Sequence, residues 1–185
     1  MRIIAGTLRG RRIAAPPGRT VRPTSDRLRE TLFNVLARSV AGARVLDAFA
    51  GTGALGIEAW SRGASSVAFV ERDARVAKVL DENLRLVGAA AGVGVVSPCA
   101  IIRGDFLTVP VPGPPFDLVL LDPPYDIAPL EDAVARGVAL ASADGVVVLE
   151  HSRRRPSPEV SGAFGRYRVL TAGDSALSFY CRTPD

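Results

Sequence analysis

The residues best suited to chemistry follow an apolar run, Phe116 to Leu121, that ends in Asp122-Pro123-Pro124-Tyr125. An apolar run of this length predicts a buried parallel strand, and two prolines stop both strand and helix. The prolines also fix two backbone φ angles, so the Asp122 carboxylate and the Tyr125 ring are held in one geometry at the carboxyl edge of the predicted sheet. Open α/β sheets bind their ligands at that edge.

A carboxylate, a backbone carbonyl and an aromatic ring in a rigid loop suit a planar base that carries an exocyclic amino group. Asp122 and the carbonyl of Pro123 accept the two amine hydrogens, and Tyr125 stacks on the ring. Asp122 can also take up the proton that the amine loses. The loop is equally consistent with a strand-ending turn whose Asp caps the next helix, so other residues have to decide.

A glycine-rich segment from Ala43 to Arg62 predicts a strand, a tight turn and a helix. Gly51-x-Gly53-x-x-Gly56 fits the dinucleotide fingerprint, which alone would suggest a nicotinamide dehydrogenase. Asp47 precedes Gly51 by four residues and argues against this function, because its carboxylate would repel a pyrophosphate. A carboxylate there suits a cationic ligand, and S-adenosylmethionine carries both an ammonium and a sulfonium group.

Two more acids end predicted strands. Glu71 ends a strand predicted over 67–71, 20 residues after Gly51, where an acid that binds ribose hydroxyls is expected; a surface glutamate is the alternative. Asp105 follows a strand predicted over 100–104 and would accept the adenine amino group while Phe106 packs on the ring. The alternative there is a helix cap beside a core phenylalanine. Residues 88–98 give no clear pattern and fit either a loop or a loose strand.

Positive charge is concentrated near the N-terminus. Residues 1–30 contain eight arginines against Asp26 and Glu30, a net charge of +6 in a chain whose total is +4. Residues 2–15 predict a β-hairpin, followed by a connector that reaches residue 24. Such a basic segment is either an arm that grips RNA or a solvated hairpin with ordinary surface charge. The RNA-binding candidates are Arg2, Arg9, Arg11, Arg12, Arg19 and Arg22.

The remaining pattern completes an α/β domain. A helix that opens with Arg22-Pro23-Thr24-Ser25-Asp26 is predicted to run to about Arg38, with Ser25 or Asp26 as its cap. Its start either faces an anionic group such as a ligand carboxylate or is a plain N-cap. Further helices are predicted over 73–87 and 130–140, and further strands over 145–150, 166–171 and 176–181.

Composition narrows the class of protein. A chain of 185 residues that is 48% hydrophobic predicts one globular domain. No apolar run approaches the roughly 18 residues of a membrane span, and the N-terminus lacks the apolar region of a signal peptide, so a cytoplasmic protein is expected. Cys99, Cys181 and His151 form neither a zinc-binding set nor a disulfide framework.

Asp47-x-x-x-Gly51-x-Gly53, Glu71, Asp105 and Asp122-Pro123-Pro124-Tyr125, in this order on successive strand ends, resemble the class I S-adenosylmethionine-dependent amino-methyltransferases. Arg2 to Gly6, Arg22 to Asn34 and Asp47 to Ala64 are more specifically similar to the RsmD family, the bacterial 16S rRNA (guanine(966)-N2)-methyltransferases. Together these matches span most of the chain.

The resemblance implies a seven-stranded, mostly parallel sheet with helices on both faces and an N-terminal β-hairpin extension. Residues 1–24 would contact RNA, and residues 25–185 would form the methyltransferase domain. Asp47, Gly51 and Gly53 would hold the methionine part of the cofactor, Glu71 its ribose, and Asp105 with Phe106 its adenine. The expected cofactor-binding residues are Asp47, Phe49, Gly51, Thr52, Gly53, Glu71, Arg72, Asp105, Phe106 and Thr24.

The same resemblance implies the reaction. Asp122, Pro123, Pro124 and Tyr125 would hold a flipped guanine whose N2 receives the methyl group, in 16S rRNA of a partly assembled small ribosomal subunit. No metal is expected, because the sulfonium is already an activated electrophile, and a monomer is sufficient. Two alternatives stay open: methylation of adenine N6 in DNA or RNA, and a non-catalytic ribosome-assembly factor with a vestigial site.

Overall fold

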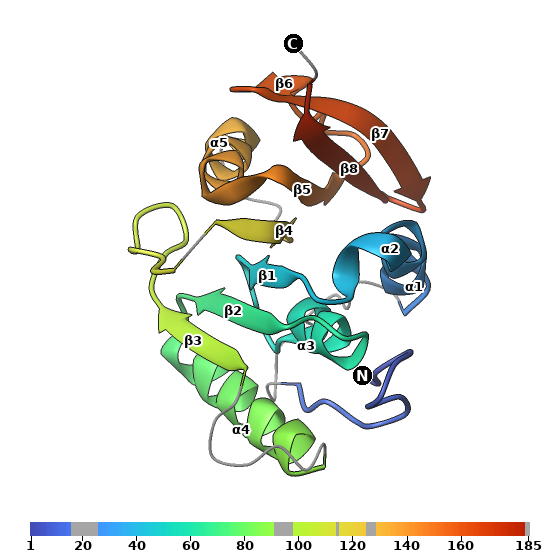
Figure 1. The fold of residues 1–185 in the computed structure, drawn as a ribbon, viewed down its shortest axis with the longest axis vertical. Coiled ribbons are helices and arrows are strands. Elements are labelled where there is room, and N and C mark those ends of the chain that lie inside the picture. Colours follow the sequence, from blue (N-terminus) through green and yellow to red (C-terminus); the bar gives the residue numbers. More distant parts are fainter. Residues whose placement is uncertain (16–25, 91–97, 114, 125–128, 184–185) are drawn as a thin grey trace.

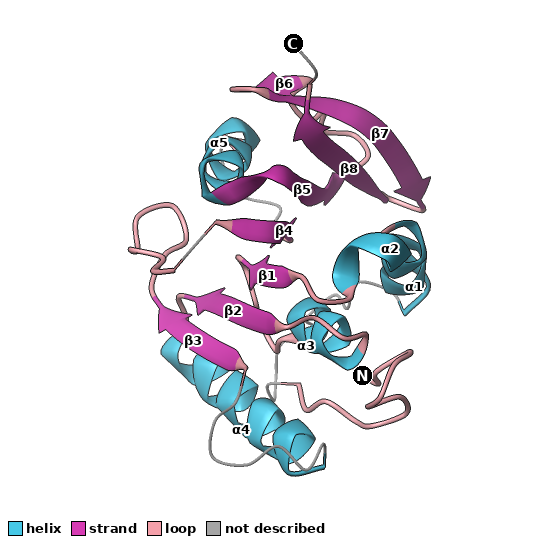
Figure 2. Cartoon of the chain, in the orientation of Figure 1, coloured by secondary structure: helices cyan, strands magenta, loops and turns pink. Residues whose placement is uncertain are grey.

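The computed structural model of the chain describes residues 1–15, 26–90, 98–113, 115–124 and 129–183 (Figure 1). One sheet with flanking helices accounts for most of them (Figure 2). The strands are β1 Arg44–Asp47, β2 Ser66–Glu71, β3 Cys99–Arg103, β4 Phe116–Leu121, β5 Ala141–Ser152, β6 Val160–Ser161, β7 Phe164–Ala172 and β8 Ser175–Arg182. The helices are α1 Asp26–Val35, α2 Ala37–Val40, α3 Ala54–Ser61, α4 Ala74–Ala90 and α5 Leu130–Leu140.

The sheet runs in the order β3-β2-β1-β4-β5-β8-β7-β6. The first five of these strands are parallel, and β8, β7 and β6 continue the sheet in antiparallel pairs. The described residues thus add one strand to the seven expected, namely the two-residue β6, which is too short for a period-two pattern to reveal. Because β1 lies between β2 and β4, the carboxyl ends of these three parallel strands meet at one edge.

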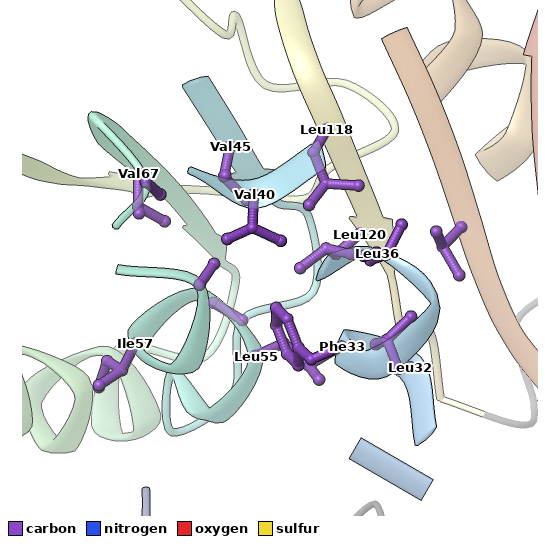
Figure 3. Close-up of a cluster of buried hydrophobic side chains, with 14 of the residues drawn as sticks. Leu32, Phe33, Leu36, Val40, Val45, Leu55, Ile57, Val67, Leu118 and Leu120 are labelled. Atoms are coloured by element: carbon purple, nitrogen blue, oxygen red, sulfur yellow. The ribbon is translucent and has the colours of Figure 1, made fainter. Parts of the chain in front are cut away.

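Alternate residues of the central strands face opposite sides of the sheet. Val45, Leu118 and Leu120 pack in a cluster with α1, α2 and α3, and Figure 3 shows this cluster around Phe33 and Ile57. The intervening residues, Leu46, Val119 and Leu121, pack in a second cluster with Leu130 and Val134 of α5. Helices therefore cover both faces, as expected, and the alternation follows from the strand period of two.

Two helices differ from their predicted extents. The helix expected over 26–38 is divided at Leu36, which has φ −82° and ψ 2°; there Ser39 donates to the Leu36 carbonyl at 2.7 Å in a tighter turn. The helix expected over 73–87 continues to Ala90, so the start of the unpatterned segment is helical. Residues 91–97 lie outside the described residues.

Residues 1–15, here called the N-terminal arm, lie beside α3 and α4 (dark blue in Figure 1). The arm reverses direction as expected. An isolated antiparallel bridge, Arg2 to Arg12, links its two halves, and the amides of Ile3 and Ile13 donate across the reversal to the carbonyls of Arg11 at 3.0 Å and Met1 at 2.9 Å. The pairing does not extend into strands, and the amides of Ile4, Ala5 and Leu8, which take no part in it, bond to Glu58 and Ser61 of α3. The arm's aliphatic residues, Ile3, Leu8 and Ile13, are buried in the first core cluster, and its four arginines, Arg2, Arg9, Arg11 and Arg12, are exposed.

Three further findings concern membranes, metals and thiols. None of the helices in the described ranges is both long and apolar enough to cross a membrane. Within the same ranges, no group of three His, Cys, Asp or Glu side chains is arranged to hold a metal ion. Cys99 and Cys181 are half-buried free thiols.

Candidate active site

Three carboxylates lie at the carboxyl edge of three adjacent strands. Asp47 ends β1, Glu71 ends β2, and Asp122 directly follows β4. Their negative charges act on one another, since Asp122 and Glu71 both contribute to raising the pKa of Asp47. The parallel topology has therefore gathered side chains from distant parts of the chain into one electronegative site.

Asp47 is the most deeply buried of the three, with a side chain that is 1% exposed. Its Oδ2 accepts a hydrogen bond from the Gly56 amide at 2.8 Å, whereas its Oδ1 has no hydrogen-bond partner among the described residues. Burial raises the pKa of Asp47 to about 7; the Gly56 bond opposes this, and the charges of Asp122 and Glu71 add to it. Among the described residues, this buried acid thus has no positive partner.

The glycine turn, residues 50–53, brings backbone close to this acid. Gly51 has φ 54°, and a Cβ at this position would meet no described heavy atom within 4 Å. Gly53 has φ 85°, and a Cβ there would lie 2.4 Å from Cδ1 of Leu80 on α4. Both glycines need the left-handed region, but Gly51 leaves backbone accessible to a ligand while Gly53 allows the turn to pack on α4.

Glu71 is held by backbone amides. Its Oε2 accepts from Gly51 at 2.9 Å and its Oε1 from Asp73 at 2.7 Å. A carboxylate has about four acceptor positions, so these two bonds leave capacity for ligand hydroxyls. Arg72, the next expected cofactor contact, is exposed beside it.

At the end of β3, the exposed Asp105 accepts a hydrogen bond from the Leu107 amide at 2.9 Å. The Phe106 ring is only 2% exposed; it meets the Phe49 ring edge-on at 5.2 Å and lies 5.5 Å from the Arg136 guanidinium carbon. Arg136 also donates to the Val109 carbonyl, which ties α5 to this loop. Contact of Asp105 and Phe106 with adenine stays a prediction, and the half-buried Phe49 is the more accessible of the two rings.

The remaining expected residues are only partly described. Asp122 is half-buried, Pro123 is buried and Pro124 is exposed. Thr52 is buried, and its carbonyl accepts from Asn83 at 3.0 Å. The other four predicted site residues, Thr24, Tyr125, Arg19 and Arg22, lie outside the described residues. The structure thus brings Asp47, the glycine turn, Glu71 and Asp122 together.

Sequence reasoning missed the side chains that hold the N-terminal arm. Glu58, with 0% exposure, accepts from the Ile4 amide at 2.8 Å, the Ala5 amide at 3.0 Å and Arg62 Nε at 2.8 Å. Ser61 Oγ accepts from the Leu8 amide at 3.0 Å. The contact between arm and α3 is so close that a Cβ at Gly6 would lie 1.8 Å from the Ser61 carbonyl oxygen.

Two other polar residues, Asn83 and Arg29, are buried although the sequence around them did not predict it. Asn83 is buried in the apolar stripe of α4, between Leu80 and Val87. A polar residue at an apolar position of this helical pattern is the sequence feature that could have pointed to a structural role for it. Arg29 was counted with the basic N-terminal charge, but it is fully buried, and it donates to the Arg2 carbonyl and to Asp26. Burial lowers the pKa of Arg29, and its charge is unavailable to a surface ligand.

Comparison with known proteins places the chain in a family. The family model described as "Conserved hypothetical protein 95" matches residues 1–181. Ribosomal RNA small subunit methyltransferase D of Escherichia coli K12 is 35% identical over 184 residues, which cover 98% of this chain and 90% of that protein. The chain belongs to the RsmD family.

Other RsmD relatives support the assignment. The Haemophilus influenzae protein of the same name is 42% identical over 135 residues, which cover 73% of this chain and 69% of that protein. A solved Escherichia coli structure superposes with a TM-score of 0.82 at 34% identity and covers 98% of this chain and 97% of that one. RsmD membership and this likeness confirm the expected class I methyltransferase fold, with eight described strands.

Proposed function

We propose that this chain transfers the methyl group of S-adenosylmethionine to the exocyclic N2 of a guanine in 16S rRNA of the small ribosomal subunit. Its membership of the RsmD family supports methyl transfer, and the names of its relatives support ribosomal RNA as the substrate. The observation that carries the proposal is the group of three carboxylates at adjacent strand ends, with Asp47 Oδ1 unpaired among the described residues.

The residues present fit this cofactor. A ligand with ammonium and sulfonium groups offsets the mutual repulsion of the carboxylates and gives the buried Asp47 the positive partner that it lacks. Asp47, Gly51 and Gly53 would hold the methionine part, Glu71 the ribose, and Asp105 with Phe106 the adenine. When bound, the cofactor supplies an already activated methyl group, so catalysis by the chain reduces to alignment and charge placement.

Asp122 has the central role toward the base. The guanine N2 lone pair is delocalised into the ring, so the amine is a weak nucleophile. Asp122 and the Pro123 carbonyl accept its two hydrogens, which orients the nitrogen, and Asp122 then takes up the proton that is lost. The base has to leave its stack to reach this loop, at a cost of a few kcal/mol.

Phosphate contacts from the N-terminal arm offset that cost. Arg2, Arg9, Arg11 and Arg12 are exposed while the backbone that carries them is fixed to α3 and α4. We therefore assign RNA contact to residues 1–24 and the reaction to residues 25–185, in a monomer that acts on the partly assembled subunit. An arm docked in this way presents its charges beside the methyltransferase domain.

The test is methyl transfer from labelled S-adenosylmethionine to unmodified small subunits, free 16S rRNA and DNA, with mass spectrometry of the labelled nucleoside. The expected product is N2-methylguanosine in small-subunit RNA. N6-methyladenosine would keep the site and overturn the substrate. Intact cofactor binding without transfer to any of the three would overturn the reaction in favour of an assembly factor.

A pair of variants tests the role of Asp122. Asp122→Asn should lower kcat by about 10²- to 10⁴-fold and leave cofactor affinity nearly intact. Asp117→Asn is the matched control, since Asp117 lies on the same strand but pairs with Arg44, at 2.9 Å, away from the carboxyl edge. An equal loss of cofactor binding in Asp122→Asn, or an equal loss of kcat in the control, would contradict the assignment.

A further inference from the structure

One buried amide connects the N-terminal arm to the glycine turn. Asn83 is 1% exposed and makes three hydrogen bonds to backbone. Its Oδ1 accepts from the Ala14 amide at 2.8 Å, and its Nδ2 donates to the Ala14 carbonyl at 3.1 Å and to the Thr52 carbonyl at 3.0 Å. The two backbone segments that it joins are 38 residues apart in sequence, at positions 14 and 52.

The arm decides which way this amide points. An Asn side chain can rotate to exchange its oxygen and nitrogen, but Ala14 offers both an N–H and a C=O, which fixes each atom opposite its proper partner. Only in this orientation does Nδ2 face the Thr52 carbonyl; the reverse would set two oxygens against each other. Loss of the Ala14 contact therefore leaves the Thr52 carbonyl as the one described partner of the amide, and the restraint on Thr52 weakens.

The glycine turn that Asn83 contacts through Thr52 has little conformational freedom. Thr52 lies between Gly51, whose amide bonds to Glu71, and Gly53, whose amide bonds to the Ala50 carbonyl at 2.7 Å. Leu80, on the same helix as Asn83, packs directly against Gly53. A displacement of the Thr52 carbonyl thus reaches the backbone that faces the buried Asp47.

We propose that Asn83 is a positioning residue that couples RNA on the N-terminal arm to cofactor at the glycine turn, so that the two ligands bind cooperatively. The proposal rests on the function proposed above. RNA phosphates on Arg11 and Arg12 favour the docked arm over an undocked one. The docked arm holds the Asn83 amide through Ala14, and the amide holds the Thr52 carbonyl. Thermodynamic reciprocity requires that cofactor strengthen RNA binding by the same factor.

The experiment measures the dissociation constant of S-adenosylhomocysteine, which has no methyl group to transfer, by calorimetry without RNA and with saturating unmodified 16S rRNA. The ratio of the two constants is the coupling. Asn83→Leu removes all three hydrogen bonds at similar volume, and Asn83→Asp keeps the acceptor for the Ala14 amide but loses the donor to Thr52. Ser61→Ala is the matched control, because Ser61 anchors the arm at Leu8 and Ala5 without touching the glycine turn.

The unaltered protein should show a ratio of about fivefold or more. Asn83→Leu and Asn83→Asp should bring the ratio close to one, whereas Ser61→Ala should keep it even though its melting temperature falls. A ratio of one in the unaltered protein, an unchanged ratio in Asn83→Leu, or an equal loss in Ser61→Ala would each overturn the coupling. Failure of the unaltered protein to bind S-adenosylhomocysteine at all would instead overturn the proposed function and the coupling with it.

Discussion

Two buried carboxylates lie near opposite ends of α3, and they differ in the number of their hydrogen-bond partners. At the start of the helix, Asp47 receives one hydrogen bond, from Gly56, and has one oxygen without a partner among the described residues. Near its end, Glu58 receives bonds from two arm amides and from Arg62. Equal burial therefore accompanies different surroundings: the satisfied Glu58 holds the arm to α3, and the unsatisfied Asp47 is the residue that we propose binds the cofactor.

The contrast has an energetic basis. A buried charge that is fully hydrogen-bonded and paired is compensated within the protein, whereas an unpaired one shifts its pKa toward the neutral form. Asp47 shows that shift, and other acids surround it. A cation that binds there relieves a cost already present in the folded protein, which makes the site selective for positive ligands.

The largest expected effect is a loss of protein stability when Glu58 is replaced. Glu58→Ala leaves the Ile4 and Ala5 amides and the Arg62 guanidinium without their acceptor, and we expect the free energy of unfolding to fall by about 3–5 kcal/mol. Urea denaturation measures this, with Glu58→Gln as the control that keeps the shape and one acceptor. The comparison fails if Glu58→Ala lowers cofactor affinity while stability stays unchanged.

A smaller loss is expected at Gly6, which touches the same end of α3. Gly6 and Gly10 have nearly the same positive φ, 84° and 82°, but a Cβ at Gly6 would lie 1.8 Å from the Ser61 carbonyl and one at Gly10 meets nothing within 4 Å. Gly10→Ala should cost about 1 kcal/mol from backbone strain alone, and Gly6→Ala should cost about 2 kcal/mol more as the arm is displaced. Equal melting temperatures would show that the arm is not held at this contact.

Substitution of Asp47 should have the opposite outcome to substitution of Glu58: cofactor affinity should fall and stability should not. Asp47→Asn removes a buried charge and keeps an acceptor for the Gly56 amide, so stability at neutral pH should be unchanged or slightly higher. Affinity for S-adenosylmethionine should fall by about 10- to 100-fold, because the cationic ligand loses its buried partner. Calorimetry and thermal melting of the same preparation separate the two effects, and a loss of stability with unaltered affinity would reverse the roles given to Asp47 and Glu58.

The last effect is a dependence on pH. Since the folded protein raises the pKa of Asp47 from 3.8 to about 7, it binds that proton more tightly than the unfolded chain does. The contribution of this group to stability is fully present below about pH 4 and is lost as the pH rises through about 7. Cofactor affinity should change in the opposite direction, rising toward pH 7 and levelling above it. Calorimetric titrations from pH 5 to 8 test this, and Asp47→Asn should remove both trends.

The meeting of the three carboxylates at one sheet edge was predictable because the residues that place them there are local in sequence. Each of Asp47, Glu71 and Asp122 ends an apolar run of strand length, and parallel strands place their carboxyl ends together whatever the sequence separation. The alternation of Val45 with Leu46 likewise follows from the strand period. The order of the motifs along the chain then identified the family.

The attachment of the arm was not predictable, because its partners are distant. Glu58 and Arg62 have the spacing of an ordinary surface ion pair on a helix, and only the amides of Ile4 and Ala5, more than 50 residues away, make Glu58 a buried anchor. The backbone bonds from Ile3 to Arg11 and from Ile13 to Met1 agree with the predicted hairpin, and the long-range bonds of Ile4 and Ala5 fix that hairpin to α3. Phe106 is a similar case, since its position after Asp105 suits either a core or a ligand contact.

The arm's anchors also constrain the order in which the chain folds. Ile4 pairs with a residue 54 positions later and Ala14 with one 69 positions later, so these contacts close long loops. During synthesis, residues 1–15 have to wait until Asn83 has left the ribosome, with Ile3, Leu8 and Ile13 exposed in the meantime. Contacts of such high sequence separation slow folding, because loop-closure entropy is lost before they form. Docking of the arm should therefore be a late folding event, which makes the nascent N-terminus a natural client for chaperones.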